Sequence, residues 1–150
     1  MRIEDAAHFL VFAVGEAKHA LPLSGVEKVE LAAEVTPFPD APHVFIGAIN
    51  WKGQILPVLS MRRRLHLPER RVRVSDRIII VQSSRRRLAL LVDEVLGVRP
   101  SRESNVTSAH ALSDGLGCVA GVTRTEDEIV LIHDLELFLS EEDEKALANL

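Results

Sequence analysis

The 150-residue sequence predicts an all-β domain that ends in one short helix. About ten short apolar runs are separated by turn residues, and nothing in the chain resembles the strand, helix and strand order of a parallel sheet. At the end of the chain Ser140 precedes EEDEKALANL, so a serine N-cap and first-turn carboxylates predict a helix over about 140–150. One or two small antiparallel barrels are therefore favoured.

The first segment predicts a hairpin followed by a third strand. Residues 9–14 read FLVFAV, and residues 19–23 are their predicted partner across a turn at Gly15. Pro22 lies in the second of these strands, which favours an edge or a bulge there. Residues 23–35 fit a turn of helix that leads into a strand, with Ser24 as a candidate N-cap.

The stretch from residue 36 to residue 67 organises the chain. It opens with three prolines, so a loop is expected before Val44. The apolar runs 44–49 and 54–59 then predict a second hairpin, whose turn reads Asn-Trp-Lys-Gly over residues 50–53. A large indole beside a cation is unusual in a simple chain reversal. Because partner contacts concentrate on loops of rigid scaffolds, this turn is a candidate contact site.

The second half predicts two more hairpins. Residues 77–82 and 88–92 are unbroken apolar runs, which are typical of a central hairpin buried on both faces, with Ile79, Val81, Leu90 and Val92 in the core. Residues 93–98 continue the sheet after a bend. Residues 100–117 read as a long surface loop, and residues 119–123 and 129–133 as the last hairpin. The chain is expected to form one domain over 1–150, with its two barrels divided near residues 82–87.

Composition indicates in which cellular compartment the protein is expected. No apolar run approaches the roughly 18 residues of a membrane span, so insertion into a membrane is not expected. The first residues do not form a secretory signal, which makes the cytoplasm the expected location. The single cysteine, Cys118, permits no internal disulfide and reads as a small buried hydrophobe.

The sequence contains no local motif typical of catalysis, phosphate binding or metal binding. The sequence contains neither GxGxxG nor GxxxxGK[ST], so a phosphate-binding loop is not predicted. The six histidines do not follow a metal-ligand spacing, so no metal and no cofactor are expected. Asp93 and Glu94 are adjacent strand residues that point to opposite faces, which makes them a poor acid–base pair. A binding module is favoured over an enzyme.

Charge is separated along the chain despite a net charge of only −4. Ten arginines lie between Arg62 and Arg87, and nine carboxylates lie between Glu126 and Glu144. Clustered cations allow an alternative function, a nucleic-acid-binding β-barrel that uses the arginines from Arg62 to Arg87. The competing interpretation is that these arginines flank strands at turns, where they are solvated or protect sheet edges.

Taken in order, these segments resemble the CheW family, the adapter proteins of bacterial chemosensory arrays. The resemblance covers nearly the whole chain and rests on FLVF at 9–12, ALPLSGVEKV at 20–29, GAINWKGQILPVLSMR at 47–62, LLVDEV at 90–95, AGV at 120–122 and LIHDLELFL at 131–139. The central family pattern is similar to G-V-I-N-L-R-G-x-x-x-P-V-x-D-L-R. It is matched by Gly47, Asn50, Gly53, Pro57, Val58 and Arg62.

The resemblance implies a fold and a set of partners. The fold would be two intertwined small five-stranded antiparallel SH3-like barrels on a shared core, without enzymatic activity. The partners would be the cytoplasmic tip of a chemoreceptor and the regulatory domain of a CheA-type histidine kinase, in arrays that can include other CheW-like domains. Receptor contacts would involve or be supported by Val26, Lys28, Gly47, Asn50, Trp51, Lys52, Gly53 and Arg62. Kinase contacts would involve the turn near Arg85 and residues 95–98.

Four positions depart from the family pattern. Lys52 replaces the usual arginine, and Trp51 replaces the usual leucine. Lys28 and Ser60 stand where acidic residues are common. Changed charge is a physical route to insulating parallel pathways, so these departures suggest a dedicated partner set, such as a type IV pilus or twitching-motility system.

Overall fold

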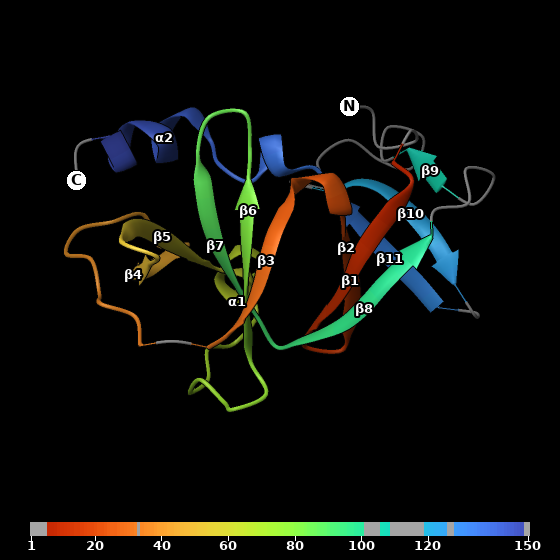
Figure 1. The fold of residues 1–150 in the computed structure, drawn as a ribbon, viewed down its shortest axis with the longest axis horizontal. Coiled ribbons are helices and arrows are strands. Elements are labelled where there is room, and N and C mark those ends of the chain that lie inside the picture. The colour runs from red at the N-terminus through yellow and green to blue at the C-terminus, as the bar shows by residue number, and fades with distance from the viewer. Residues whose placement is uncertain (1–5, 33, 101–105, 109–118, 126–127, 149–150) are drawn as a thin grey trace.

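Two β-sheets pack side by side, and the short helices lie at their periphery (Figure 1). The computed structural model describes residues 6–32, 34–100, 106–108, 119–125 and 128–148. The six-stranded sheet has the order β8-β1-β2-β11-β10-β9, and the five-stranded sheet has the order β3-β6-β7-β5-β4. The predicted all-β class is confirmed.

The bounds of the elements follow the chain. The six-stranded sheet contains β1 (His8–Val14), β2 (Ala17–Pro22), β8 (Glu94–Pro100), β9 (Val106–Ser108), β10 (Val119–Thr125) and β11 (Glu128–His133). The five-stranded sheet contains β3 (Val26–Leu31), β4 (Phe45–Trp51), β5 (Gln54–Ser60), β6 (Arg77–Gln82) and β7 (Arg87–Val92). The helical segments are η2 (Leu23–Gly25), α1 (Met61–Arg64), η5 (Leu135–Leu137) and α2 (Glu141–Ala148).

The chain passes between the two sheets twice, so the sheets are intertwined. It leaves the six-stranded sheet after β2, forms the whole five-stranded sheet, and returns at Asp93 between β7 and β8. The turn at 82–87, where the sequence suggested a division between barrels, joins β6 and β7 of one sheet. Both of these strands are apolar on two faces and pair along their whole length, so a boundary between them would expose buried residues.

The sheets are mostly but not entirely antiparallel, which corrects the expected antiparallel barrels. β11 pairs with β2 in parallel, and β5 pairs with β7 in parallel. In both cases the two strands come from different hairpins, so no tight turn joins them and no antiparallel course is imposed. Ser24 is not an N-cap, because Pro22 holds that position of η2 and no side chain caps it.

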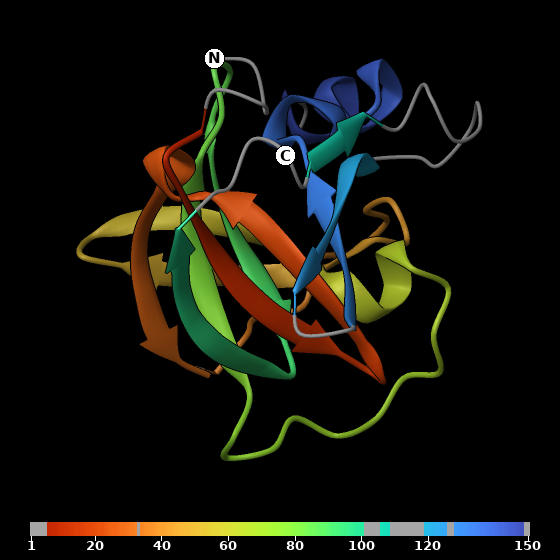
Figure 2. The same ribbon diagram turned by 90° about the vertical axis from the view of Figure 1, so that its right-hand side faces the viewer.

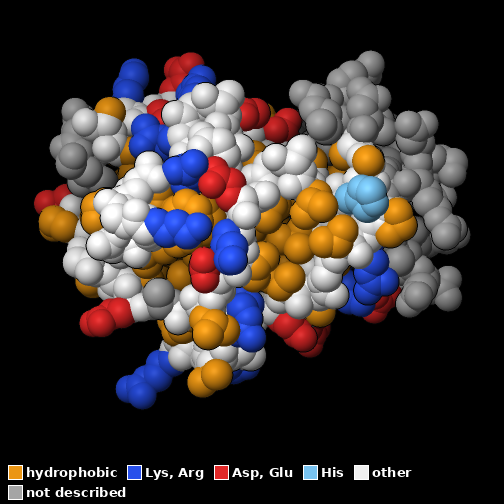
Figure 3. Space-filling view, viewed as in Figure 1, with side chains coloured by type: hydrophobic (Ala, Val, Ile, Leu, Met, Phe, Trp, Pro, Cys, Tyr) orange, Lys and Arg blue, Asp and Glu red, His pale blue; other side chains and the backbone are white. Residues whose placement is uncertain are grey.

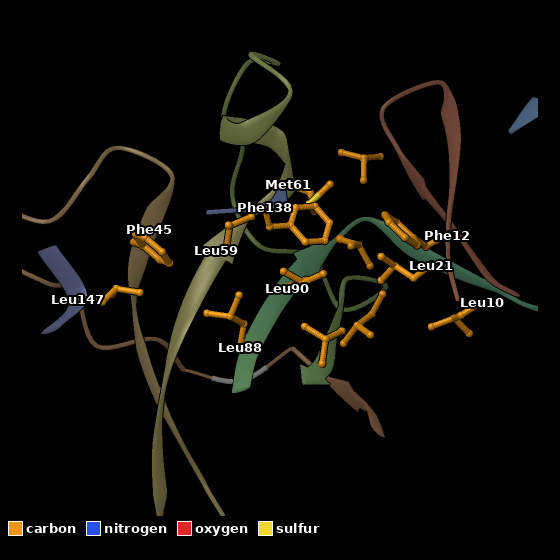
Figure 4. Close-up of a cluster of buried hydrophobic side chains, with 14 residues drawn as sticks. Leu10, Phe12, Leu21, Phe45, Leu59, Met61, Leu88, Leu90, Phe138 and Leu147 are labelled. Carbon is orange, nitrogen blue, oxygen red and sulfur yellow. The ribbon is translucent and has the colours of Figure 1, made fainter. Parts of the chain in front are cut away.

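Three clusters of buried side chains hold the sheets together. The central core lies between the sheets, and Figure 4 shows Leu59, Leu88 and Leu90 in it together with Phe12 and Leu21 of the six-stranded sheet. A second cluster lies on the other face of the five-stranded sheet, and a third on the other face of the six-stranded sheet. The predicted core residues, Ile79, Val81, Leu90 and Val92, are all fully buried in the central core.

The C-terminal helix is fixed by its own cap and by the central core. The Asp143 backbone N–H donates to Ser140 Oγ at 3.1 Å, and the Ser140 N–H donates to Asp143 Oδ2 at 3.1 Å, a reciprocal capping arrangement. Leu147 of α2 is buried in the central core, close to Phe45 in Figure 4. The predicted helix after Ser140 is therefore confirmed, and it returns the end of the chain to the five-stranded sheet (Figure 1).

A pair of buried histidines lies where β2 and β11 run side by side. His19 Nδ1 and His133 Nε2 are 2.8 Å apart, with Phe12 and Phe138 stacked nearby. Burial lowers the pKa of His19 to about 4 and that of His133 to about 3, and the charges of His19 and Arg64 add to the second shift. His19 Nε2 is buried without a hydrogen-bond partner in the described part of the chain. We infer that His19 is protonated at Nδ1 and donates to His133, because a buried N–H without an acceptor is the costlier arrangement.

The long loop expected over residues 100–117 is partly a strand. Within residues 100–117, which the sequence predicted to be a loop, residues 106–108 form β9 and pair with β10. The remainder of that loop beyond Pro100, and Cys118, lie outside the described residues. Figure 2 shows that the connection between α1 and β6, at residues 65–76, extends away from both sheets.

Candidate functional site

The turn between β4 and β5, residues 50–53, is exposed and has a fixed shape. We call it the hairpin tip. Asn50 Oδ1 accepts a hydrogen bond from the Gly53 backbone N–H, three residues along the chain, at 2.9 Å, and this hydrogen bond closes the turn. Lys52 has φ 52° and Gly53 has φ 82°, so both adopt the left-handed conformation that this tight turn needs. The Lys52 side chain is presented from an ordered backbone.

Trp51 links the two outer strands of the five-stranded sheet. Its indole is half-buried against the cluster behind that sheet, and Nε1 donates to Glu30 Oε1 of β3 at 3.2 Å. The Lys52 ammonium lies 4.8 Å from the centroid of the ring, and the Arg87 guanidinium lies 5.5 Å from it. Both distances are within the range of a cation–π interaction. Trp51, one of the four departures from the family pattern, therefore joins β3 to β4 by a side-chain contact.

Arg87 completes this group from the start of β7. Its Nε donates to Glu27 Oε1 at 2.7 Å, and it also contacts Gln54. We call Glu27, Glu30, Trp51, Lys52 and Arg87 the Trp51 cluster. The sequence analysis did not single out Glu27, Glu30 or Arg87 for this site. Their partners are 21 to 60 residues away in the chain, so no local spacing could have indicated them.

The remaining expected contact residues on β3 and β4 differ in accessibility. Lys28 is exposed on β3, and Val26 is half-buried against the central core. Gly47 is buried at a bulge of β4, where a Cβ would lie 2.1 Å from the Thr36 carbonyl oxygen. Gly47 therefore supports the hairpin because only glycine admits this close approach, and it offers no side chain to a partner.

Arg62 lies at the opposite end of the hairpin from the tip. β5 has seven residues, and at about 3.3 Å per residue it separates the two ends by roughly 20 Å. Arg62 donates to Asp93 twice, from Nε at 3.0 Å and from Nη2 at 2.7 Å. The structure thus does not bring Arg62 together with the hairpin tip, although both belong to one sequence motif.

Asp93 connects the two sheets at the point where the chain crosses between them. Besides Arg62, it binds Arg70 Nη2 at 2.9 Å and accepts from the Gly15 N–H of the β1–β2 turn at 2.8 Å. Arg70 also binds Asp76 through two hydrogen bonds. We call Arg62, Arg70, Asp76 and Asp93 the Arg62 network.

The aspartates of the Arg62 network are held in their charged form. Burial acts to raise the pKa of Asp93, but hydrogen bonds from Arg62 and the Gly15 N–H, with the charges of both arginines, lower it overall. Burial also acts to raise the pKa of Asp76, and hydrogen bonds from Arg70 and the Arg73 N–H lower it overall. These opposite charges satisfy one another, which is typical of a structural ion-pair network.

Most of the clustered arginines are engaged inside the molecule. Carboxylates or backbone carbonyls bind Arg62, Arg63, Arg70, Arg77, Arg86 and Arg87. On the face of the molecule that Figure 3 shows, basic side chains are interleaved with acidic ones and lie next to an apolar area. A nucleic-acid backbone needs uncompensated cations, so these arginines do not favour the alternative of a nucleic-acid-binding barrel.

The described part of the chain contains no group of three or more histidine, cysteine, aspartate or glutamate side chains arranged to hold a metal ion. Among its helices, none has the length and apolar character required to cross a membrane.

Comparison with known proteins identifies the family. The family model described as the CheW-like domain matches residues 8–143. The chain belongs to the CheW-like domain family. Among CheW-like relatives, the chemotaxis protein CheW of Treponema pallidum is 26% identical over 157 residues, covering 100% of this chain and 92% of the relative. The chemotaxis protein CheW of Bacillus subtilis is 28% identical, covering 93% of this chain and 91% of the relative.

A solved CheW structure has the same fold. The scaffolding protein TtCheW of Thermoanaerobacter tengcongensis aligns with a TM-score of 0.83 and 26% identity, covering 92% of this chain and 95% of that protein. The SH3-like architecture implied by the resemblance is consistent with this match. The chain is thus a CheW-like scaffold or adapter protein of chemotaxis signalling, and the solved relative is itself named a scaffolding protein.

Proposed function

We propose that this CheW-like protein is a non-enzymatic adapter that couples the cytoplasmic tips of chemoreceptors to a CheA-type histidine kinase. The observation that carries the proposal is the CheW-like match over residues 8–143, on a fold that presents an ordered hairpin tip. In this role the protein works in the cytoplasm, at receptor arrays, and can assemble there with other CheW-like domains.

The receptor-facing surface in this proposal is the hairpin tip with the adjoining face of β3. Asn50, Trp51, Lys52 and Gly53 form the tip, Lys28 extends the charged area, and Val26 and Gly47 support it from below. A helical receptor tip is recognised by apolar contact with a few charged anchors, which a half-buried indole beside two lysines can supply. Arg62 is left out of this surface because the Arg62 network already binds it at the other end of β5.

The kinase-facing surface in this proposal lies on the β6–β7 turn and on β8. The β6–β7 turn carries exposed Arg85, and Val98 of β8 is 49% exposed. Both belong to the segments that the family resemblance assigned to kinase contacts. They lie on different elements from the hairpin tip, so one molecule could hold receptor and kinase together.

The departures at Lys28, Trp51 and Lys52 support a dedicated partner set, such as a pilus or twitching-motility system, because they change the charge and shape of the proposed receptor surface. The departure at Ser60 has a local role instead. Ser60 is buried at 6% exposure, and its Oγ accepts from the Arg63 N–H at 3.3 Å at the start of α1. It therefore caps a helix and does not contribute to partner choice.

Charge reversal at the hairpin tip tests the proposal. Lys52→Glu should weaken binding of a purified chemoreceptor hairpin by more than tenfold, about 1.4 kcal/mol, because it places a carboxylate at the contact. The thermal midpoint should stay nearly unchanged, since Lys52 is exposed. The matched control is Lys145→Glu at an exposed position of α2, which should bind as the wild type does. Wild-type affinity in Lys52→Glu would show that the tip is not the receptor site.

A further inference from the structure

The charges around Trp51 are only partly paired inside the molecule. Glu27 is bound by Arg87 at 2.7 Å, and the Glu30 carboxylate accepts from the indole of Trp51. Lys28 and Lys52 have no carboxylate partner among the residues that the structure describes. Both lysines are exposed. The positive charge at this end of the five-stranded sheet is therefore the part left available to another molecule.

We propose that the Trp51 cluster together with Lys28 is a preorganised docking surface for a protein segment that presents carboxylates, with Lys28 and Lys52 as the charged anchors and Trp51 as the residue that positions Lys52. The inference rests on the proposed function, because it assigns a partner chemistry to the same hairpin tip. It goes beyond that function by bringing in Glu27, Glu30 and Arg87.

Trp51 can act as a positioning residue because its ring is held from several sides. The hydrogen bond to Glu30 fixes the orientation of the indole, and packing against the cluster behind the sheet fixes its depth. The Lys52 ammonium then rests 4.8 Å from the centroid of a ring that cannot turn freely. A lysine side chain loses considerable rotamer freedom when it is bound, so restricting it beforehand reduces the entropic penalty of docking.

Arg87 differs from Lys52, because its charge is already paired within the molecule. Its guanidinium lies 5.5 Å from the same ring, but Glu27 neutralises it at 2.7 Å. Arg87 therefore fixes the ring without adding free charge to the surface. This difference between two cations on one indole predicts that partner binding depends on Lys52 and Lys28, while Arg87 affects mainly the stability of the cluster.

A protein segment fits this surface better than a nucleic acid. Lys28 lies on β3 between Glu27 and Glu30, so the two lysines do not form a continuous row of uncompensated cations, which a phosphate backbone would need. Ile55, which pairs with Asn50 next to the tip, is 67% exposed and offers apolar contact to a side chain. Separate carboxylates on a partly apolar segment match this mixture.

The test uses the full chain and fluorescein-labelled poly-glutamate, with binding measured by anisotropy. The wild type should bind the probe with an affinity that decreases as salt increases. The double variant Lys28→Gln, Lys52→Gln should bind it at least tenfold more weakly, and Lys145→Gln should match the wild type. Trp51→Phe keeps an aromatic ring but loses the hydrogen bond to Glu30, so it should weaken binding severalfold.

The only tryptophan of the chain is Trp51, so its emission reports directly on this surface. Poly-glutamate should change the emission of the wild type, and poly-lysine should not. No binding of poly-glutamate, or equal binding by the wild type and the double lysine variant, would overturn the inference. Duplex DNA that competes as well as poly-glutamate would overturn the assignment to an acidic protein segment.

A purified chemoreceptor hairpin separates this inference from the proposed function. If poly-glutamate binding depends on the lysines but the hairpin does not bind, the docking surface stands and the receptor-coupling function fails. If the hairpin binds the wild type and the double lysine variant equally, the function stands and the inference fails. Loss of hairpin binding in the double variant, with Lys145→Gln unaffected, supports both.

Discussion

At the tip of the β4–β5 hairpin the Lys52 ammonium has no carboxylate partner in the described part of the chain, whereas at its base Arg62 is bound twice by Asp93. Both residues come from one continuous motif and lie on one hairpin. The surroundings decide the difference. The base lies where the chain crosses between the sheets, and the tip lies where the sheet meets solvent. A charge at a crossing point stabilises the fold, and a charge at an exposed tip remains available for a partner.

The comparison also separates two uses of a rigid backbone. At the base, rigidity comes from one carboxylate, that of Asp93, which forms ion pairs with Arg62 and Arg70 and accepts a hydrogen bond from the Gly15 N–H. At the tip, it comes from the hydrogen bond between Asn50 and Gly53 and from an indole held by Glu30. Mutations at the base should therefore change the free energy of unfolding, and mutations at the tip should change binding.

Replacing Asp93 with alanine should give the largest effect. The change leaves Arg62 and Arg70 without their shared partner, and loss of one side of a largely buried ion pair costs about 3 kcal/mol or more. Urea unfolding should show the loss as a lower midpoint. Asp93→Asn still accepts from the Gly15 N–H, so it should lose less stability than alanine. A wild-type midpoint for Asp93→Ala would show that the crossing point does not depend on this network.

Acid should affect the interior without any mutation. Both buried histidines have pKa values below the usual 6.5, about 4 for His19 and about 3 for His133, so the unfolded chain binds more protons below pH 6.5. The free energy of unfolding should therefore fall as pH falls, by on the order of 3 kcal/mol between pH 7 and pH 5. The lowered pKa values of Asp76 and Asp93 add their loss only below about pH 4, so the range from 5 to 6.5 reports on the histidines.

His19→Phe gives the matched variant for this pH dependence. It keeps an aromatic ring beside Phe12 and His133, but it removes one of the two titrating groups. The slope of the unfolding free energy against pH between 5 and 6.5 should drop from about two protons to about one. An unchanged slope would mean that His19 binds protons equally in the folded and the unfolded protein, so that burial does not lower its pKa.

Arg62→Ala should destabilise the protein less than Asp93→Ala. Asp93 keeps Arg70 and the Gly15 N–H as partners, so the loss should be about 2 kcal/mol, within the range for hydrogen bonds to a charged group. At a temperature where the variant is folded, its affinity for a receptor hairpin should equal that of the wild type. A loss of affinity without a loss of stability would reverse the roles of the base and the tip.

Local sequence patterns were sufficient for the elements whose cause is local. The apolar runs of β6 and β7 predicted a hairpin buried on both faces, and the serine before an acidic stretch predicted the cap of α2. The hairpins at β1–β2, β4–β5 and β10–β11 were also predicted, because each pairs neighbouring segments.

Pairing between distant segments could not be predicted in this way. An alternating or apolar pattern shows which face of a strand is buried, but not which strand lies beside it, so the parallel pairs β11–β2 and β5–β7 gave no signal. The same limit applies to side chains. Arg62 and Asp93 are 31 residues apart, and Trp51 and Glu30 are 21 apart, so the motif could not show that Arg62 faces inward and that Trp51 joins β3.

Lys52→Arg should give the smallest effect and tests which property of the tip matters. Either side chain keeps the positive charge and can rest on the Trp51 ring, and both face the same backbone strain at φ 52°. Arginine differs by its planar fork, which can bind a carboxylate through two hydrogen bonds. Binding of the protein's own receptor hairpin should change by less than about threefold, roughly 0.6 kcal/mol, if charge and position decide the contact.

The informative comparison for Lys52→Arg is a receptor from a system whose adapter has arginine at this position. If the lysine is an adaptation to a dedicated receptor, arginine should strengthen binding to that foreign receptor and should not strengthen binding to the protein's own. The Lys145→Arg variant controls for a general effect of the guanidinium. A gain on both receptors would instead mean that the lysine weakens a common contact, so the hairpin tip would set affinity without setting partner choice.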